Sequence, residues 1–138
     1  MSKQKVILVI VLFTMVFAAC KQKPETKIIG FWQLKEYKNN QEVAPELKDL
    51  YKQHIEEYVR TSSFEFKADS TLITKEKGEM ATGKWTVDKD LKKITMYDDL
   101  LNSYAVVDIV SVDDKKMVLK SKNQGFEVQM TLEKTENK

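Results

Sequence analysis

The stretch Phe126-Glu-Val-Gln-Met-Thr-Leu-Glu133 decides the fold class, because its apolar and polar residues alternate without a break. Successive side chains of a β-strand point to opposite faces, so this pattern predicts a strand with one buried face and one face in water. The same alternation recurs in earlier runs of the chain: Trp32–Leu34, Phe64–Ala68, Trp85–Val87, Ile94–Met96 and Met117–Leu119. Residues that favour turns, such as Asp69-Ser70 and Asn123-Gln124-Gly125, separate the runs. The chain is therefore predicted to be mainly β.

Extending each run to the neighbouring turn residues predicts eight strands, at residues 28–37, 63–68, 71–77, 82–88, 93–97, 104–112, 117–122 and 125–134. Hairpins in sequence order are the simplest antiparallel arrangement, and eight such strands suit a small closed up-and-down barrel without exposed edges. Two runs do not reveal their buried face. Residues 71–77 could face either way, and residues 104–112 are apolar at both parities except at Asp108, which indicates a strand covered on both sides or bent by a bulge.

One segment after the first strand has a helical period instead. Residues 45–60 place six side chains on one stripe: Leu47, Leu50, Tyr51, His54, Ile55 and Tyr58. Pro45 suits the first helical position, and Arg60 suits the negative C-terminal end of the helix. The pattern predicts one amphipathic helix of about four turns. We expect its apolar stripe to dock on one mouth of the barrel, with a partner protein as the alternative occupant.

The first 19 residues have the order of a secretory signal peptide: Lys3 and Lys5, an apolar run at 6–17, then Ala18-Ala19. The run is shorter than the roughly 20 apolar residues that span a bilayer, which disfavours the alternative of a permanent transmembrane helix. Cys20 is the one cysteine of the chain and so has no intramolecular disulfide partner. Its position directly after two alanines resembles the lipobox of bacterial lipoproteins, although an unmodified thiol behind an ordinary signal peptide is the alternative.

The lipobox resemblance implies that Cys20 becomes the first residue of the mature chain and carries fatty acyl chains such as palmitate. Such chains hold a protein on a membrane without a spanning helix. The predicted organisation is then a signal peptide at 1–19, a lipidated cysteine with a flexible tether at 20–27, a barrel domain at 28–134 and a polar tail at 135–138. Because position 21 is not Asp, the sorting of similar lipoproteins implies the outer membrane of the cell envelope, with the membrane face left open.

Charge and residue counts disfavour several function classes. Without residues 1–19 the chain has 21 basic and 21 acidic side chains, so it is neutral and a nucleic-acid partner is disfavoured. His54 is the one histidine, there is no second cysteine, and the four glycines form no phosphate-binding loop. Hydrolytic triads and most metal sites need more such groups than this. We expect a protein that is not an enzyme and has no catalytic residue, metal or cofactor.

Several motifs resemble a known family. Gly30-Phe31-Trp32 resembles the Gly-x-Trp motif that opens the lipocalin barrel. Residues 64–71, 83–88 and 110–119 are similar to phrases in the lipocalin-like domains of small lipoproteins of Bacteroidetes, and the resemblance covers nearly all of residues 28–134. Lipocalins commonly place an Arg of the last strand over the motif Trp. Arg60 is the one arginine here and lies in the helix, so Lys134 is expected to contact Trp32 through a cation–π interaction.

The inward face of the predicted barrel supplies the candidate ligand-binding residues. They are Trp32, Leu34, Phe64, Phe66, Trp85, Met96, Met117, Phe126, Val128 and Met130. Aromatic and Met side chains make adaptable walls for a hydrophobic ligand, but they also make an ordinary core, so both a cavity and a filled barrel stay open. The leading hypothesis is a lipid-anchored barrel that binds or carries a small, neutral hydrophobic molecule. The alternative is a non-enzymatic interaction module with a filled barrel, such as an accessory subunit of an envelope complex or an inhibitor of a secreted enzyme.

Overall fold

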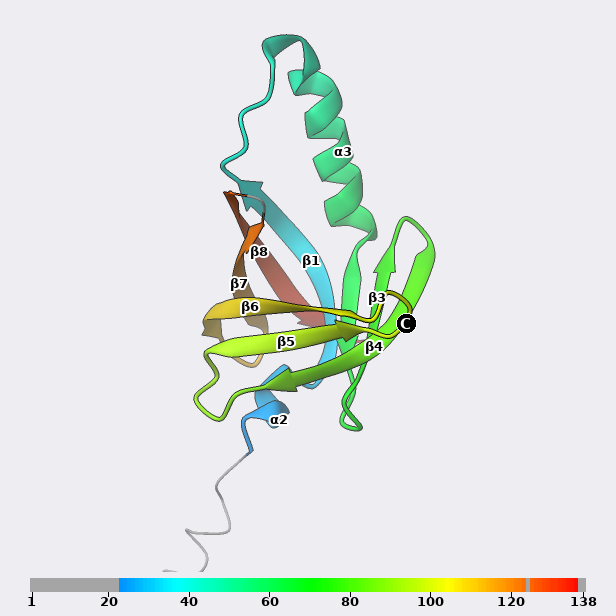
Figure 1. The fold of residues 1–138 in the computed structure, drawn as a ribbon, viewed down its shortest axis with the longest axis vertical. Coiled ribbons are helices and arrows are strands. Elements are labelled where there is room, and N and C mark those ends of the chain that lie inside the picture. Colours follow the sequence, from blue (N-terminus) through cyan, green and yellow to red (C-terminus); the bar gives the residue numbers. More distant parts are fainter. Residues whose placement is uncertain (1–22, 124, 137–138) are drawn as a thin grey trace, which may run out of the picture.

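The computed structural model describes residues 23–123 and 125–136. Eight strands close into a single antiparallel barrel, and each strand pairs with its neighbours in sequence (Figure 1). The strands are β1 (Gly30–Asn39), β2 (Ser63–Phe66), β3 (Thr71–Glu76), β4 (Glu79–Val87), β5 (Lys93–Asp98), β6 (Ser103–Val112), β7 (Lys116–Asn123) and β8 (Phe126–Thr135). The predicted mainly β, up-and-down barrel with one helix after the first strand is therefore confirmed. The predicted signal peptide, Cys20 and the end of the predicted tail lie outside the described residues.

Strand pairing fixes the inward faces that the sequence left open. Leu72 pairs with Gly83 and Val107 pairs with Ile94, so Leu72 and Val107 face the same interior as their partners and are buried. Between β6 and β7 the register shifts after Ile109, which shows that the bulge is the correct reading of residues 104–112. A second shift, after Leu34 in β1, bends that strand where it passes toward the upper part of the barrel in Figure 1.

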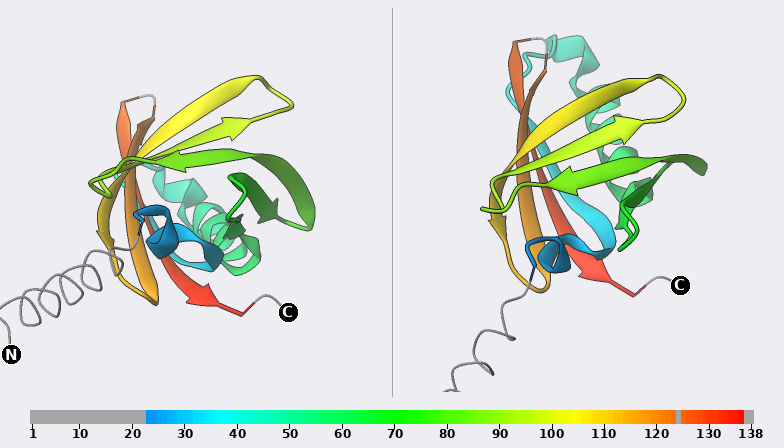
Figure 2. Two further views of the ribbon diagram at one scale, coloured as in Figure 1. Left: turned by 90° about the horizontal axis from the view of Figure 1, so that it is seen from below. Right: turned by 60° about the horizontal axis from the view of Figure 1, so that its bottom comes forward.

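A short helix, α2 (Glu25–Ile28), lies across one end of the barrel, as the view from below in Figure 2 shows. Ile28 is fully buried in the core, and Lys27 forms an exposed ion pair with Asp114 in the β6–β7 turn, at 3.2 Å. The prediction of a flexible tether at 20–27 therefore differs from the structure at Glu25–Lys27, which belong to a helical turn. Burial of Ile28 in the core places this turn against the barrel. We call this the closed end of the barrel.

The Gly-x-Trp motif holds the closed end together. The Trp32 indole is fully buried, and its Nε1 donates a hydrogen bond to the Ile28 carbonyl at 2.7 Å. The Lys134 Nζ lies 4.9 Å from the centre of the Trp32 ring, which confirms the predicted cation–π contact. Burial also lowers the pKa of the Lys134 ammonium. Gly30 has a φ of +147°, and a Cβ there would lie 3.0 Å from the Lys134 Cε, so glycine lets the lysine stem cross the strand.

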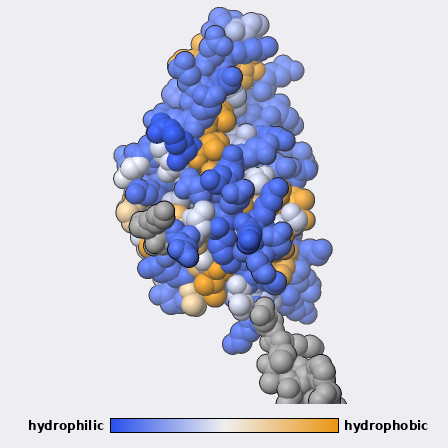
Figure 3. Space-filling model, turned by 180° about the vertical axis from the view of Figure 1, so that it is seen from behind, coloured by the Kyte–Doolittle hydropathy of each residue, from blue (hydrophilic) through white to orange (hydrophobic). Residues whose placement is uncertain are grey.

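The predicted helix is present but docks over only part of its length. A 3-10 turn, η1 (Pro45–Leu47), leads into α3 (Lys48–Thr61), with Pro45 at the start as expected. Tyr58 and Val59 pack against the core, whereas Leu47 and Leu50 are 50% and 54% exposed. The expectation that the whole stripe docks is wrong, because β1 ends at Asn39 and no strand lies under the first turns of the helix (Figure 1). Figure 3 shows hydrophobic residues at this end amid a mainly hydrophilic surface.

Two hairpin turns at the closed end, β4–β5 and β6–β7, have the same pattern of hydrogen bonds. Asp88 Oδ1 accepts hydrogen bonds from the backbone N–H groups of Lys92 and Lys93, and Asp113 Oδ1 accepts them from Lys115 and Lys116. These hydrogen bonds favour the ionised carboxylate, so they hold the pKa of both aspartates below its usual range. Both aspartates therefore have a local, structural role in their turns.

Candidate functional site

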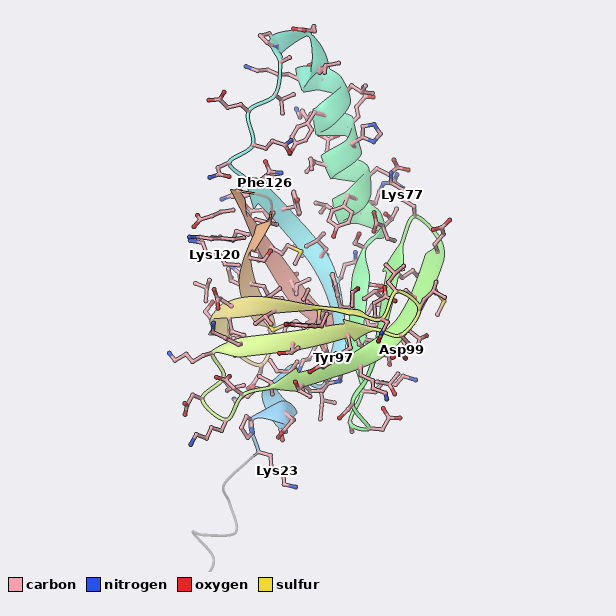
Figure 4. The ribbon with its side chains drawn as sticks, viewed as in Figure 1. Lys23, Lys77, Tyr97, Asp99, Lys120 and Phe126 are labelled. Carbon is pink, nitrogen blue, oxygen red and sulfur yellow. The ribbon has the colours of Figure 1, made fainter. Side chains whose placement is uncertain are left out.

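The opposite end of the barrel is open and holds a cavity of about 300 Å³. We call this the open end; it carries α3 and the β3–β4, β5–β6 and β7–β8 turns. Its orientation is visible in Figure 4, where Lys77 and Phe126 lie on the opposite side of the molecule from Lys23, which precedes α2. The described lining comes from four consecutive strands: Leu72, Thr74, Ala81, Thr82, Gly83, Met96, Tyr97, Asp98, Ser103, Tyr104 and Ala105.

The cavity exists because small side chains occupy the inward positions of β4 and β6 near this end. Gly83 pairs with Asp98, and Met96 pairs with Ala105, so these residues alternate in step with the buried Trp85 and Val107 deeper in the barrel. Ala and Gly fill little of the space that a larger residue would occupy. The barrel is thus packed toward its closed end and hollow toward its open end.

A layer of aromatic side chains lies one step deeper. Phe66 and Trp85 meet edge to face, with ring centres 5.3 Å apart, and both are buried. The Trp85 Nε1 donates to the Lys67 carbonyl at 3.0 Å, which satisfies the polar atom of the indole. Trp85 is also the cross-strand partner of Met96, which lines the cavity. This layer therefore separates the cavity from the core at the closed end.

The ten predicted ligand-binding residues fall into two groups. Trp32, Leu34, Phe66, Trp85, Met117 and Val128 are buried and pack in the interior, whereas Phe64, Met96, Phe126 and Met130 are partly buried. Of the ten, Met96 is the residue that lines the open-end cavity. The prediction picked large apolar side chains, and large side chains are those that fill space rather than leave it. Contact of any of the ten with a ligand stays a prediction.

The other lining residues were missed for a physical reason. Ala81, Gly83, Ser103 and Ala105 are too small or too polar to register as an apolar alternation, and Thr74 lies in a strand whose face the sequence did not reveal. A usable signal does exist, since Ala81 and Gly83 keep the parity of Trp85, and Ser103 and Ala105 keep that of Val107. Small residues at inward-facing positions near the end of a strand therefore predict a cavity at that end of the barrel.

The chemistry of the lining is apolar with a few oxygen atoms. Thr74, Thr82 and Ser103 bring hydroxyl groups, and Asp98 brings a carboxylate. The Asp98 Oδ1 accepts hydrogen bonds from the backbone N–H groups of Leu100 and Leu101, at 2.9 and 3.0 Å. The described lining contains no Lys, Arg or His. The cavity therefore offers hydrogen-bond acceptors and hydroxyl groups, and no cation.

The helix contributes tyrosines to the wall of the open end. Tyr58 of α3 meets Tyr37 of β1 edge to face at 5.3 Å, and the Asn39 amide donates to the Tyr51 hydroxyl at 2.5 Å. Burial, followed by the charge of Glu76, raises the pKa of the Tyr58 hydroxyl. Tyr58 therefore stays neutral over the ordinary pH range and acts as a packing group.

Three further observations concern the candidates for catalysis, metal binding and membrane crossing. His54 lies on the exposed side of α3, beside a separate hollow formed with residues 41–44. Within the described ranges, no three His, Cys, Asp or Glu residues are grouped to hold a metal ion. Among the described helices, none has the length and apolar character required to cross a bilayer.

Fold and cavity together define a class: closed up-and-down β-barrels of eight strands with a cavity at one mouth. A family model described as a lipocalin-like domain matches residues 28–119, and the chain belongs to this family. The match begins at the buried Ile28 and ends within β7. No curated protein matches the chain. The resemblance of the Gly30-Phe31-Trp32 motif to the lipocalin opening is confirmed at the level of the domain.

Proposed function

We propose that this protein binds or carries a small hydrophobic molecule in its open-end cavity and is not an enzyme. The cavity of about 300 Å³ is the observation that supports this most, since it lies at the lower limit of ordinary ligand pockets. Membership of the lipocalin-like family supports it as well, because such barrels generally bind small hydrophobic molecules. The apolar part of the lining, Leu72, Ala81, Met96 and Ala105, would contact the ligand.

The lining favours a neutral ligand over a fatty acid. A fatty-acid carboxylate needs a cation near its binding position, and the described lining contains none, while Asp98 would repel it. A hydroxyl or amide group on the ligand could instead donate to Asp98 or exchange hydrogen bonds with Thr74 and Ser103. The proposed ligand is therefore a neutral hydrophobe with a hydrogen-bonding group at one end.

Filling the cavity should abolish carriage without unfolding the barrel. Ala105 is exposed and faces the cavity, so we expect Ala105→Phe to weaken binding of an environment-sensitive hydrophobic dye at least about tenfold. Stability should change by no more than about 0.5 kcal/mol, as for other exposed positions. Dye titration monitored by fluorescence measures the affinity, and urea unfolding measures the stability.

The neighbouring position supplies a matched control. Val106 is exposed on the outer face of the same strand, so Val106→Phe adds an aromatic ring at the adjacent residue without entering the cavity. It should bind the dye as the unchanged protein does. Native mass spectrometry after gentle purification tests the natural occupant. A barrel that arrives empty and also leaves the dye unbound would refute the proposal.

We also propose that Cys20 carries acyl chains and anchors the protein in the bacterial envelope, at the outer membrane, as a lipoprotein of the Bacteroidetes type. The position of Cys20 after Ala18-Ala19 supports this, as does its place in the chain relative to α2. Residues 21–24 separate Cys20 from α2, and four extended residues reach at most about 14 Å. An anchored molecule would thus hold its closed end near the bilayer.

Removing the thiol tests the anchor. We expect Cys20→Ser to shift the protein from the membrane fraction to the soluble fraction, because a hydroxyl cannot accept the thioether-linked lipid. Immunoblotting of fractionated cells measures the distribution, and metabolic labelling with a fatty acid measures acylation directly. Labelling that persists in Cys20→Ser, or retention of the variant in membranes as before, would exclude lipidation at this residue.

A second candidate function is the non-enzymatic interaction module. The exposure of Leu47 and Leu50 on α3 favours it, because large apolar side chains grouped at a surface often mark contacts with other proteins. The two functions separate in one comparison. Ala105→Phe should impair a carrier, whereas Leu50→Ser should impair an interaction module and leave dye binding unchanged.

A further inference from the structure

The exposed large hydrophobic residues of the described chain are concentrated on one hairpin. Nine such residues are exposed, and six of them belong to β5, β6 or the turn between them: Tyr97, Leu100, Leu101, Tyr104, Val106 and Val110. Leu100 and Leu101 in the turn are 91% and 71% exposed. Scattered single apolar residues on a surface are ordinary, but a cluster of this kind marks a contact surface.

The hairpin presents this cluster on a braced, projecting tip. Figure 2 shows β5 and β6, yellow-green to yellow, reaching outward beside the green β3–β4 hairpin, which extends at least as far. The two backbone N–H groups of Leu100 and Leu101 donate to the Asp98 carboxylate, which fixes the turn. Tyr97 and Tyr104 are cross-strand partners with ring centres 6.0 Å apart, and they support the turn from behind. We call residues 99–102 the hairpin tip.

Polarity along the hairpin changes in steps from the tip toward the barrel. The two leucines come first and the tyrosine pair second. On the same outer face as the tyrosines, Thr95 and the exposed Val106 form the next outward pair, and the pair after that is Lys93 and Asp108, which form an ion pair at 3.6 Å. Lys84 of β4 lies opposite Tyr97 and adds a second exposed lysine at the level of the rings. From the tip inward, the order is therefore leucine, then tyrosine with Lys84 beside it, then the Thr95–Val106 pair and the Lys93–Asp108 ion pair.

The same order of side chains suits the depth profile of a lipid bilayer. Hydrocarbon accepts leucine, the interface concentrates tyrosine, and lysine ammonium groups reach the phosphates of the headgroups. Asp99 lies in the tip and is exposed, as Figure 4 shows beside Tyr97, so its carboxylate limits the tip to a shallow position. We propose that the hairpin tip of this protein docks on a lipid bilayer, with Leu100 and Leu101 entering the edge of the hydrocarbon.

The shape of the tip favours lipid over a protein partner. A stable protein interface buries about 800 Å² on each partner, with shapes that match across it. The tip is a turn of four residues between two strands, and four residues present much less surface than that. A fluid bilayer needs no matching surface, since lipid chains adapt to two inserted side chains.

The docked orientation has a consequence for the cavity. Tyr97, Asp98, Ser103 and Tyr104 belong to the hairpin and also line the open-end cavity. A hydrophobic molecule would therefore move between bilayer and cavity with little exposure to water. This consequence rests on the proposed carrier function, but the bilayer contact itself does not. The tip and the proposed anchor at Cys20 belong to opposite ends of the barrel, so both reach one bilayer only when the barrel axis lies along the membrane surface (Figure 1).

A tryptophan placed in the tip tests the contact directly. The full-length chain carrying Leu101→Trp is reconstituted with phosphatidylcholine vesicles whose acyl chains are brominated, and its emission is compared with that in unbrominated vesicles. Bromine quenches only a nearby indole. We expect the fluorescence added by Leu101→Trp to fall by at least half and to shift to the blue. Trp32 and Trp85 are buried in the barrel and give a background common to all variants.

Leu50→Trp is the matched control, because Leu50 is also an exposed leucine but lies on α3. Its added fluorescence should be the same in both kinds of vesicle, even though the same residues 1–20 are present. Equal emission of Leu101→Trp in both vesicles would overturn the proposal, and so would a blue shift without quenching, which would place the tip against protein. Dye titration of both variants reports the carrier function separately, and circular dichroism confirms that each barrel is folded.

Discussion

Replacing Trp32 by alanine should lower the free energy of unfolding by about 3 to 5 kcal/mol, the usual cost of deleting a buried aromatic side chain. The indole is fully buried, and three elements meet on it: Ile28 of α2, Phe64 of β2 and Lys134 of β8. Its removal leaves a void, an Ile28 carbonyl without its 2.7 Å donor and a lysine ammonium without its ring. Urea unfolding followed by circular dichroism gives the value.

Two variants show which part of the loss comes from burial. Phe31 precedes Trp32 on the opposite face of β1 and is only partly buried, so Phe31→Ala should cost clearly less. Lys134→Met keeps the hydrophobic stem but removes the charge, so its cost measures the cation–π contact at about 0.5 to 2 kcal/mol. A loss below about 1 kcal/mol for Trp32→Ala would contradict the central place of this residue in the core.

The barrel could be predicted because its inner face is dry and its outer face is wet over most of its strands. Phe126 to Glu133 shows this in eight consecutive residues, and the turn aspartates mark where each run ends. The docking of the helix could not be predicted in the same way. An amphipathic stripe shows which side of a helix is apolar. How much of that side is covered by the barrel depends on where β1 ends, and the sequence around Asn39 contains no clear signal for the end of the strand.

The cavity was harder to predict than the core for a related reason. Periodicity detects residues that need to be buried, whereas a cavity is made by residues that leave space. Leu72 and Val107 were hidden in runs without a clear parity, and their faces follow only from their pairing with Gly83 and Ile94. Met96 was found because it is both large and inward. Ala105 was not, although its parity with Val107 would have identified it once β6 was oriented.

Replacing Gly83 by alanine should have the second-largest effect on the free energy of unfolding. It should lower this free energy, whereas the same replacement in most strands raises it. Alanine in place of glycine within a strand usually stabilises by roughly 0.5 to 1 kcal/mol. At Gly83 an added Cβ would collide with the backbone carbonyl of Tyr97 on the neighbouring strand β5. The position of the added Cβ is fixed by the β4 backbone, and the Tyr97 oxygen belongs to the β5 backbone. Rotation of a side chain therefore cannot relieve the contact, and β4 has to separate from β5 at the Gly83–Asp98 pair. We expect Gly83→Ala to destabilise by about 3 kcal/mol, the upper part of the overpacking range.

The collision at Gly83 also connects stability to the cavity, since Gly83, Tyr97 and Asp98 all line it. Separation of the two strands in Gly83→Ala should therefore weaken dye binding even in the folded protein. Trp32→Ala, far from the cavity, should weaken dye binding only by unfolding the barrel. Gly78 is the matched glycine: it has a φ of +82° and open space around its Cβ position, so Gly78→Ala carries the backbone cost of about 1 to 2 kcal/mol alone. If Gly83→Ala proves as stable as the unchanged protein, then β4 and β5 do not approach each other as closely as this pairing requires.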